Sequence, residues 1–360
     1  MPIFHSLPLR RETENRLLAT YRKGLSSHWG AATRSLAHLL GILGLGTGWS
    51  ASERRFLSSS VRSTGLSMAE RRGVHRLLNP AAFPLSHNIL KNKALFARHV
   101  AATGLPAPET FDPQSEELEA WLAERSAILA KPGYSSKGKG IAAYTREREH
   151  WSGSQGRLSP AELTTRLETV LARHGVVQEL VPAHPKLADL SPGALPTLRI
   201  VTCLDEQGEP EACAKVLRLG SGGERPVDNF NAGGLAVRLD EEGRCVAAFR
   251  ASGASTESIA VHPATGARIV GREIEGVDEA VALALRAHAT LPAGFTVVGW
   301  DIGLSDRGPV LIEGNWNPGT DIVQLVDGVG LDRTRLGELY RFHLAQLPDA
   351  SWQQSRPIEW

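Results

Sequence analysis

The chain has 360 residues, enough for two or three subdomains, and its 42% hydrophobic and 22% charged residues are typical of a folded soluble protein. The apolar run from Leu36 to Leu45 is about half of the roughly 20 residues that a membrane span needs, so it predicts a buried helix and no transmembrane segment. Residues 1–11 have no apolar core before their first arginines, and we therefore expect no secretory signal.

The formal charge of +1 is unevenly distributed along the chain. Residues 1–100 hold 15 Lys and Arg against 4 Asp and Glu, and the remainder holds 25 against 35. This imbalance indicates either an acidic partner for the first region or a neutralising contact between the two parts, although most of the arginines fit solvated helix faces. We expect no nucleic-acid ligand.

The three cysteines lie in or beside apolar stretches, and no two of them have the spacing of a metal pair or of a disulfide framework. Cys203, Cys213 and Cys245 are therefore predicted to be buried thiols, which indicates a cytoplasmic location.

In the first third of the chain the pattern is helical. Residues 11–80 predict helices broken by glycine and serine, including one from Ser67 to Leu78 that begins with a serine cap and Glu70 three residues later. A further helix is expected from Ser86 to Thr103, where Gly104 stops it and Pro106 gives an extended exit.

After Pro106, short apolar runs alternate with turns. Helices are predicted at Pro160–His174, Val277–Leu291 and Asp332–Gln346. The predicted strands are Ala127–Ala130, Ile141–Tyr144, Val176–Val181, Thr197–Leu204, Ala212–Leu217, Gly234–Val237, Arg244–Ala248, Thr296–Leu304 and Val310–Glu313. Strand pairs at hairpin distance with few crossover helices predict an α+β fold with mostly antiparallel sheets.

A glycine- and serine-rich loop joins the first two of these strands. It follows Lys131 and runs from Gly133 to Gly140, so small residues would let backbone amides approach a polyphosphate. It is not a P-loop, because the GxxxxGK[ST] pattern is absent and a strand follows. Taken alone, such a loop is more often a flexible β-turn than a nucleotide site. The strand that ends at Gln178 and Glu179 is a natural edge for an adenine ring, but on its own it is simply a strand.

The strongest pattern is the predicted hairpin Val297–Gly319, with a turn at Ser305–Pro309. A hairpin centred near Arg307 places Asp301 across from Glu313, and Asn315, two residues on, projects from the same face. Burying two carboxylates beside one amide in apolar surroundings costs free energy unless a cation neutralises them. Because all three residues offer hard oxygen ligands, the cation that fits is Mg²⁺. A solvated sheet face with incidental acids is disfavoured by the apolar residues around them.

The order of these parts resembles the ATP-grasp superfamily over roughly residues 86–325. The hairpin is similar to the metal strands of ribosomal-protein glutamate ligases, while Leu195–Thr202 and Val227–Gly234 resemble the sugar-transfer-associated branch. The resemblance implies two α+β subdomains that clasp ATP. The implied division is a helical basic region at 1–85, a pre-grasp helix and first subdomain at 86–181, a second subdomain at 182–330, and a C-terminal helix and tail at 331–360.

The resemblance also implies roles for individual residues. Mg²⁺ would be held by Asp301, Glu313 and Asn315, and the transferred phosphoryl group would face Arg199, Arg218 and Asn231. ATP would be bound by Lys93, Lys131, Ser135, Ser136, Gly138, Gln178, Glu179, Leu180 and His184. The expected ribose-binding acid has no clear counterpart, with His184, Lys186 and Asp189 as candidates, and the additional lysines Lys137 and Lys139 have no assigned target.

The implied activity is ATP-dependent ligation of a small-molecule carboxylate to an amine through an acyl phosphate, with release of ADP and phosphate. Two alternatives stay open. One is an ATP-grasp kinase that phosphorylates a hydroxyl group, and the other is a nucleotide-binding module without turnover. The complete set of Asp301, Glu313 and Asn315 argues against the inactive module, and the sequence does not separate ligase from kinase.

Overall fold

The computed structural model describes residues 15–27, 48–133, 140–154, 156–222, 230, 233–252 and 255–354. Its strands form two sheets, one with the order β4-β3-β2-β1-β5 and one with the order β10-β9-β8-β7-β6-β11-β12. All neighbouring strands in both sheets are antiparallel, so the predicted α+β architecture is confirmed. The apolar run Leu36–Leu45 lies outside the described residues.

The strands follow the short apolar runs of the sequence. The five-stranded sheet consists of β1 (Ala127–Lys131), β2 (Ala142–Glu147), β3 (His150–Gly153), β4 (Gly156–Leu158) and β5 (Val176–Glu179). The seven-stranded sheet consists of β6 (Thr197–Leu204), β7 (Pro210–Leu219), β8 (Leu235–Leu239), β9 (Cys245–Ser252), β10 (Ser255–Ile259), β11 (Val297–Ser305) and β12 (Gly308–Asn315).

Helices precede, connect and follow the sheets. The α-helices are α1 (Arg16–Ser27), α4 (Ala51–Phe56), α5 (Ser59–Ser63), α6 (Met68–Leu78), α7 (Lys93–Thr103), α8 (Leu118–Ala123), α9 (Pro160–Ala172), α10 (Val277–Ala289), α11 (Asp321–Asp327), α12 (Arg335–Gln346) and α13 (Asp349–Gln354). Short 3₁₀ turns are η2 (Pro80–Ala82), η3 (Leu85–His87), η4 (Pro185–Leu187) and η6 (Leu331–Arg333).

The helix α6 shows how local sequence sets these bounds. Ser67 caps its first turn, and the side chain of Glu70 returns a hydrogen bond to the backbone of Ser67, as the sequence predicts. The helix predicted from Ser86 begins later, at Lys93, because the side chain of Asn92 accepts hydrogen bonds from the amides of Ala94 and Leu95.

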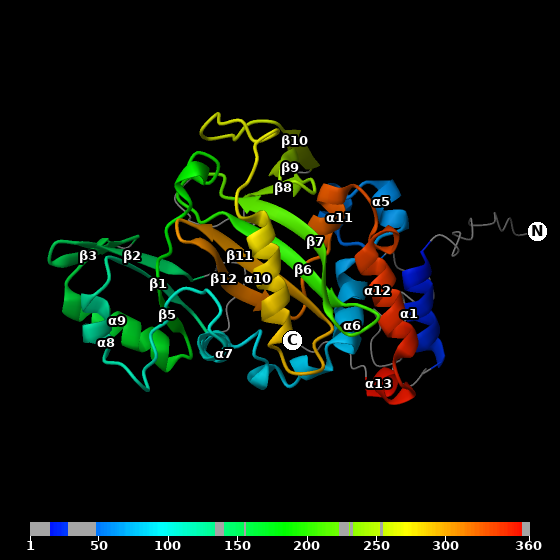
Figure 1. Cartoon of the computed structure of the whole chain (residues 1–360), viewed down its shortest axis with the longest axis horizontal. Coiled ribbons are helices and arrows are strands. Elements are labelled where there is room, and N and C mark those ends of the chain that lie inside the picture. The colour runs from blue at the N-terminus through cyan, green and yellow to red at the C-terminus, as the bar shows by residue number, and fades with distance from the viewer. Residues whose placement is uncertain are drawn as a thin grey trace, which may run out of the picture.

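The two faces of the seven-stranded sheet are covered by different helices. On one face, α10 crosses the sheet and contacts β6, β7, β11 and β12, and alternate residues such as Leu198 and Ile200 pack beneath it (Figure 1). On the other face, Val201 and Val216 belong to a second core together with residues of α1, α6, α11 and α12. Arg199 of β6 and Asp301 of β11 are cross-strand neighbours, and their side chains lie on this second face. The N-terminal helices therefore pack on the face of the sheet that also carries the predicted site.

The smaller sheet has a core of its own. Ile128, Trp151 and Val177 pack against Leu163 and Leu167 of α9 and against α8, on the left of Figure 1. This core is separate from both cores of the larger sheet. The two sheets thus pack separately, and the division into subdomains with boundaries at 85, 181 and 330 stays a prediction.

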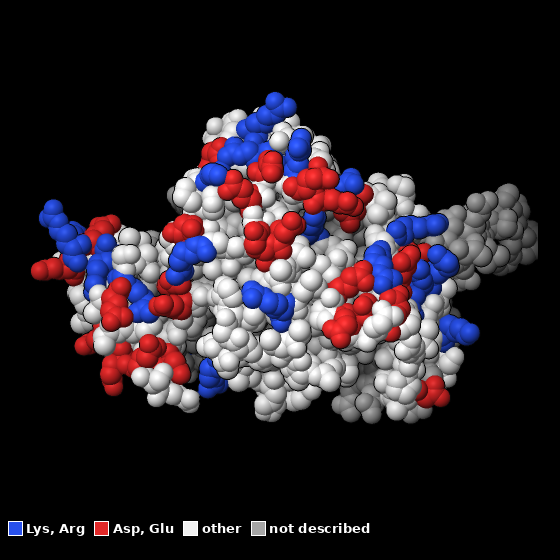
Figure 2. Space-filling view, in the orientation of Figure 1, with Lys and Arg blue, Asp and Glu red and all other residues white. Residues whose placement is uncertain are grey.

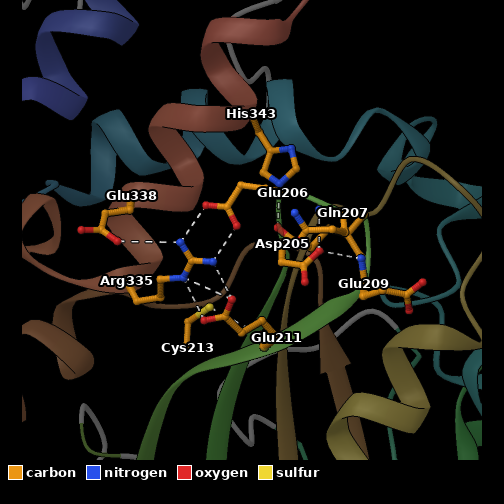
Figure 3. Close-up of polar contacts among 10 residues, drawn as sticks. Asp205, Glu206, Gln207, Glu209, Glu211, Cys213, Arg335, Glu338 and His343 are labelled. Atoms are coloured by element: carbon orange, nitrogen blue, oxygen red, sulfur yellow. Dashed lines mark hydrogen bonds and ion pairs between the residues drawn. The ribbon is translucent and has the colours of Figure 1, made fainter.

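A charged cluster ties α12 to the hairpin of β6 and β7. The guanidinium group of Arg335 donates to both carboxylate oxygens of Glu206, at 2.8 and 2.6 Å, and to Glu211 at 2.8 and 2.9 Å (Figure 3). His343 of the same helix is hydrogen-bonded to the carbonyl of Leu204 at 2.7 Å. These contacts join the C-terminal helix to the sheet.

Acidic and basic side chains are intermixed on the surface. In Figure 2 they lie next to one another toward the ends of the molecule, while the centre of this view, over α10, carries few charges. Arg71 forms an ion pair with Asp321, a contact between the basic first region and the acidic remainder. In the described ranges, no helix is both long and apolar enough to span a membrane.

Candidate functional site

The predicted metal residues meet on one hairpin. Asp301 of β11 is paired with Glu313 of β12, which is the predicted pairing. The pairing does not arise from a hairpin centred on Arg307, the arrangement predicted from the sequence. The turn pairs Ser305 with Gly308, and a β-bulge after Asp301 then shifts the register by one residue. The bulge aims these side chains, and Asn315 lies close enough for its Nδ2 to donate to Oε1 of Glu313 at 3.3 Å.

Asp301 is held by two arginines. Arg199, its cross-strand neighbour on β6, donates to both carboxylate oxygens, with 2.9 Å between Nη2 and Oδ2, and Nη1 of Arg218 donates to Oδ2 at 3.0 Å. Burial alone would raise the pKa of Asp301, but the charges of Arg199 and Arg218 outweigh it and hold this pKa well below its usual range. Arg218 lies near the end of β7 and is buried, because Asp301 provides its counter-charge.

Glu313 is the second acid of the site. The residue is exposed to solvent, yet desolvation by the groups around its carboxylate, and then the charge of Asp301, raise its pKa above the ordinary value. Two carboxylates in hydrogen-bond contact need a shared proton or a cation, so this oxygen donor set fits Mg²⁺. Asn315 presents its N–H to Glu313, and a half-turn of the amide would present its oxygen instead. Across the described ranges, no group of three His, Cys, Asp or Glu residues could hold a metal ion, so the set depends on Asn315.

Two lysines come from the other side of the site. Lys131 ends β1 and is 9% exposed, and burial lowers its pKa to about 8, with Glu313 and Asp301 opposing the shift and Lys93 adding to it. Lys93 begins α7, and its Nζ lies 3.4 Å from the carbonyl of Gly133. The charges of Glu313 and Asp301 affect the pKa of Lys131, and the charge of Glu313 affects that of Lys93, so both lysines lie near the β11–β12 hairpin. A polyphosphate site between the two sheets would need this arrangement.

The predicted adenine strand is mostly engaged with its own sheet. The amide of Glu179 donates to the carbonyl of Glu109 at 2.9 Å, and that of Leu180 donates to Ala127 at 3.1 Å. The side chain of Gln178 donates to Thr110, and Glu179 forms an ion pair with Arg307. The amides of Glu179 and Leu180 are therefore not available to a base, which leaves carbonyl oxygens or later amides for that contact.

The candidate ribose contacts also have partners. Nδ1 of His184 accepts from the amide of Lys186 at 3.2 Å and caps η4. Lys186 pairs with Glu275, and Asp189 pairs with Arg272. All three residues thus have structural contacts, and a role for His184 toward ATP stays a prediction. Four further predicted residues lie outside the described part of the chain, namely Ser135, Ser136, Gly138 and Asn231.

The structure also shows residues near the site that the sequence pattern did not identify. Asn79, at the end of α6, donates to the carbonyls of Val297 and Trp316 at 2.7 and 2.6 Å and accepts from the amides of Thr296 and Val297. His75 hydrogen-bonds to Asn317 at 2.9 Å. Both residues connect the N-terminal helices to the ends of the β11–β12 hairpin. In the sequence, the only indication of a role for Asn79 is its position directly after the predicted helix Ser67–Leu78.

A buried histidine supports the segment after β7. Nε2 of His262 lies 2.8 Å from the carbonyl oxygen of Gly220, and the Oγ of Ser191 accepts from the amide of Gly220 at 2.9 Å. The Nδ1 of His262 accepts from the amides of Ala264 and Thr265. His262 carried no signal in the sequence, since nothing there predicts its distant partner.

The comparison with protein families identifies the chain. The family model described as sugar-transfer-associated ATP-grasp matches residues 74–338, more than half of the sequence. The chain belongs to this ATP-grasp family. The match begins within α6 and ends within α12, so it includes the second half of α6 and only the first turn of α12.

Solved structures offer more distant similarities. N5-carboxyaminoimidazole ribonucleotide synthetase from Thermotoga maritima is 14% identical (TM-score 0.40; 75% of this chain and 52% of that one). D-alanyl-alanine synthetase A from Vibrio cholerae is 12% identical (0.42; 72% and 65%), and L-amino acid ligase from Bacillus licheniformis is 16% identical (0.36; 65% and 42%). The chain spans about half the length of two N5-carboxyaminoimidazole ribonucleotide synthetase structures, 52% of the Thermotoga maritima protein and 46% of purK in its ADP complex. No curated protein matches the sequence.

Proposed function

We propose that the protein is an ATP-dependent carboxylate–amine ligase that forms an amide through an acyl phosphate and releases ADP and phosphate. The observation that carries the proposal is the cluster in which Arg199 and Arg218 hold Asp301 beside Glu313 and Asn315. Family membership supports ATP as a substrate. The choice of ligation over other phosphoryl transfers is the proposal.

Each group has a role in this reaction. Lys93 and Lys131 would bind the phosphates as point charges, and burial strengthens that attraction because it excludes water. Arg199 and Arg218 would stabilise negative charge as the γ-phosphoryl group moves to the carboxylate substrate. Mg²⁺, held by Asp301, Glu313 and Asn315, would supply further neutralisation of phosphate charge when bound. The amine then displaces phosphate from the acyl phosphate.

Hydroxylamine trapping tests the ligase activity. An acyl phosphate is a reactive anhydride, whereas a phosphate ester is not, so an acid substrate with ATP, Mg²⁺ and hydroxylamine should give a hydroxamate while ADP accumulates. Acids and amines are first screened by ATP-dependent phosphate release. A stable phosphorylated product without hydroxamate, for every acid tested, would instead establish the kinase.

The arginine variants sharpen this test. Arg199→Ala should suppress hydroxamate formation more than it weakens ATP binding, because its charge matters most when the phosphoryl group moves. Arg250→Gln is the matched control, since Arg250 lies on the same sheet in a partly exposed pair with Glu257. Equal losses of ATP binding and hydroxamate in Arg199→Ala would contradict the assigned role.

The state of the cysteines supports a cytoplasmic site of action, which is part of the proposal. Cys203, Cys213 and Cys245 are all free. Cys203 and Cys245 are buried as predicted, whereas Cys213 is only partly buried, and desolvation raises the pKa of each thiol. Raised pKa values disfavour the reactive thiolate. Free buried thiols are the ordinary state in a reducing compartment.

A further inference from the structure

A buried arginine with unused donors lies beside the metal hairpin. Arg71 of α6 is 7% exposed, and its Nε has no hydrogen-bond partner in the part of the chain that the structure describes. Its Nη1 lies 3.7 Å from Oδ1 of Asp321, which is an ion pair but exceeds hydrogen-bond range. A guanidinium group carries five N–H donors, and leaving a buried donor unpaired is costly. This arrangement favours a ligand that the protein alone does not supply.

The position of Arg71 connects it to the site. His75, one helical turn further on α6, contacts Asn317, so the face formed by these two residues lines the segment after Asn315. At Gly319, a Cβ atom would lie 3.5 Å from Nη1 of Arg71 and 2.8 Å from Oδ1 of Asp321. Glycine therefore keeps space open between the two charges. Gly319 is four residues beyond Asn315, a chain distance of at most about 14 Å.

We infer that Arg71 binds a substrate carboxylate that takes no part in the reaction. The reacting group of the same small molecule lies at the β11–β12 hairpin. The side chains of Arg71 and Asp321 are 9% and 18% exposed, which leaves a narrow opening for such a group. The planar fork of arginine matches the two oxygens of a carboxylate. The inference rests on the proposed function in treating this anion as part of a substrate.

The surrounding charges favour a carboxylate over a phosphate. Asp321 already places one negative charge against the one positive charge of Arg71. Burial lowers the pKa of His75 to about 3, so this neighbour adds no positive charge at neutral pH. A phosphate near −2 would meet more repulsion from Asp321 than a carboxylate of charge −1. An amino acid or a dicarboxylate therefore fits this position better than a sugar phosphate.

Thermal unfolding without ATP tests the site on the full chain. The probes are succinate, glutarate, L-alanine, acetate and inorganic phosphate, each titrated against the wild type, Arg71→Gln and Arg71→Lys. Arg55→Gln is the matched control, because Arg55 is an exposed arginine of α4 in the same basic region. At ten times its Kd, a binding carboxylate should raise the wild-type Tm by about 2 °C.

The expected result is a shift with at least one carboxylate in the wild type and in Arg55→Gln. Affinity should be at least tenfold lower in Arg71→Gln and intermediate in Arg71→Lys, with ADP affinity unchanged in all variants. Equal shifts in wild type and Arg71→Gln, no shift with any carboxylate, or a shift with phosphate alone would overturn the inference. Should Arg71→Gln not fold, unchanged affinity in Arg71→Lys would overturn it as well. Because no ATP is present, failure here is distinct from failure of hydroxylamine trapping.

Discussion

Raising the pH should weaken nucleotide binding through Lys131. Burial at the end of β1, with a further contribution from the charge of Lys93, lowers the pKa of this amino group to about 8, while Glu313 and Asp301 oppose the shift. At pH 7 about nine in ten of these groups are protonated in the free protein, and at pH 9 about one in ten. Bound phosphates favour the charged form and return its pKa toward the ordinary value. Affinity for ADP should therefore fall about tenfold, or about 1.4 kcal/mol, between pH 7 and pH 9.

The same group has the opposite effect on stability. Its pKa is lower in the folded than in the unfolded chain, so between pH 8 and about 10.4 the unfolded chain binds more protons and stability rises with pH. Below pH 8 the buried charge costs up to about 3 kcal/mol. The buried cysteines, with raised pKa values, oppose this trend in any variant. The measurable quantity is therefore the difference in unfolding free energy between wild type and Lys131→Met.

Calorimetric titration of ADP from pH 7 to 9.5, with EDTA present, measures the effect without a metal. The titration of phosphate itself, with a pKa of about 6, lies below this range. Lys131→Met should bind ADP more weakly at pH 7 and show little dependence on pH. Lys23→Met, which changes an exposed lysine of α1, should behave as wild type. A flat profile in the wild type, or the same slope in Lys131→Met, would refute the reasoning.

Three further results are expected. Glu313→Gln should keep the fold, seen by circular dichroism, but reduce ADP release by orders of magnitude, because a metal clamp contributes several kcal/mol; near-normal turnover would exclude its metal role. Lys131→Ala should weaken ATP binding more than Lys137→Ala, as measured by nucleotide titration, because Lys131 leaves a rigid strand; equal losses would contradict this ranking. Asn79→Ala removes four hydrogen bonds to backbone groups and should lower the unfolding free energy in urea by about 4 kcal/mol, and a loss under 1 kcal/mol would refute the assignment.

Strands in the middle of a sheet could be predicted from the sequence, because their side chains are mostly buried. Thr197–Leu204 was predicted with its observed bounds, because a run of mostly apolar and β-branched residues between turn residues leaves little choice of ends. β3, β4 and β10 were not predicted, since short strands such as Gly156–Leu158 are mostly exposed and carry little hydrophobic signal. The pairing of Asp301 with Glu313 was predicted, but the β-bulge that produces it was not, because a one-residue shift leaves no mark in composition.

The contacts that complete the site come from residues distant in sequence, which is why pattern alone could not find them. Asn79 and Arg71 lie on a helix whose other signals are those of any amphipathic helix, and their partners are more than 200 residues away. Arg199 and Asp301 were assigned separately, one to phosphate and one to metal, although each neutralises the other in the nucleotide-free protein.

That pairing gives the site a specific electrostatic character. Its acids, Asp301 and Glu313, face four cations, Arg199, Arg218, Lys93 and Lys131, so these six side chains carry a formal surplus of two positive charges. The acids keep the buried cations tolerable before a ligand arrives, because an unpaired charge in this setting would destabilise the fold. The surplus then attracts a polyphosphate. The same balance that permits the fold thus leaves the charge that nucleotide binding requires.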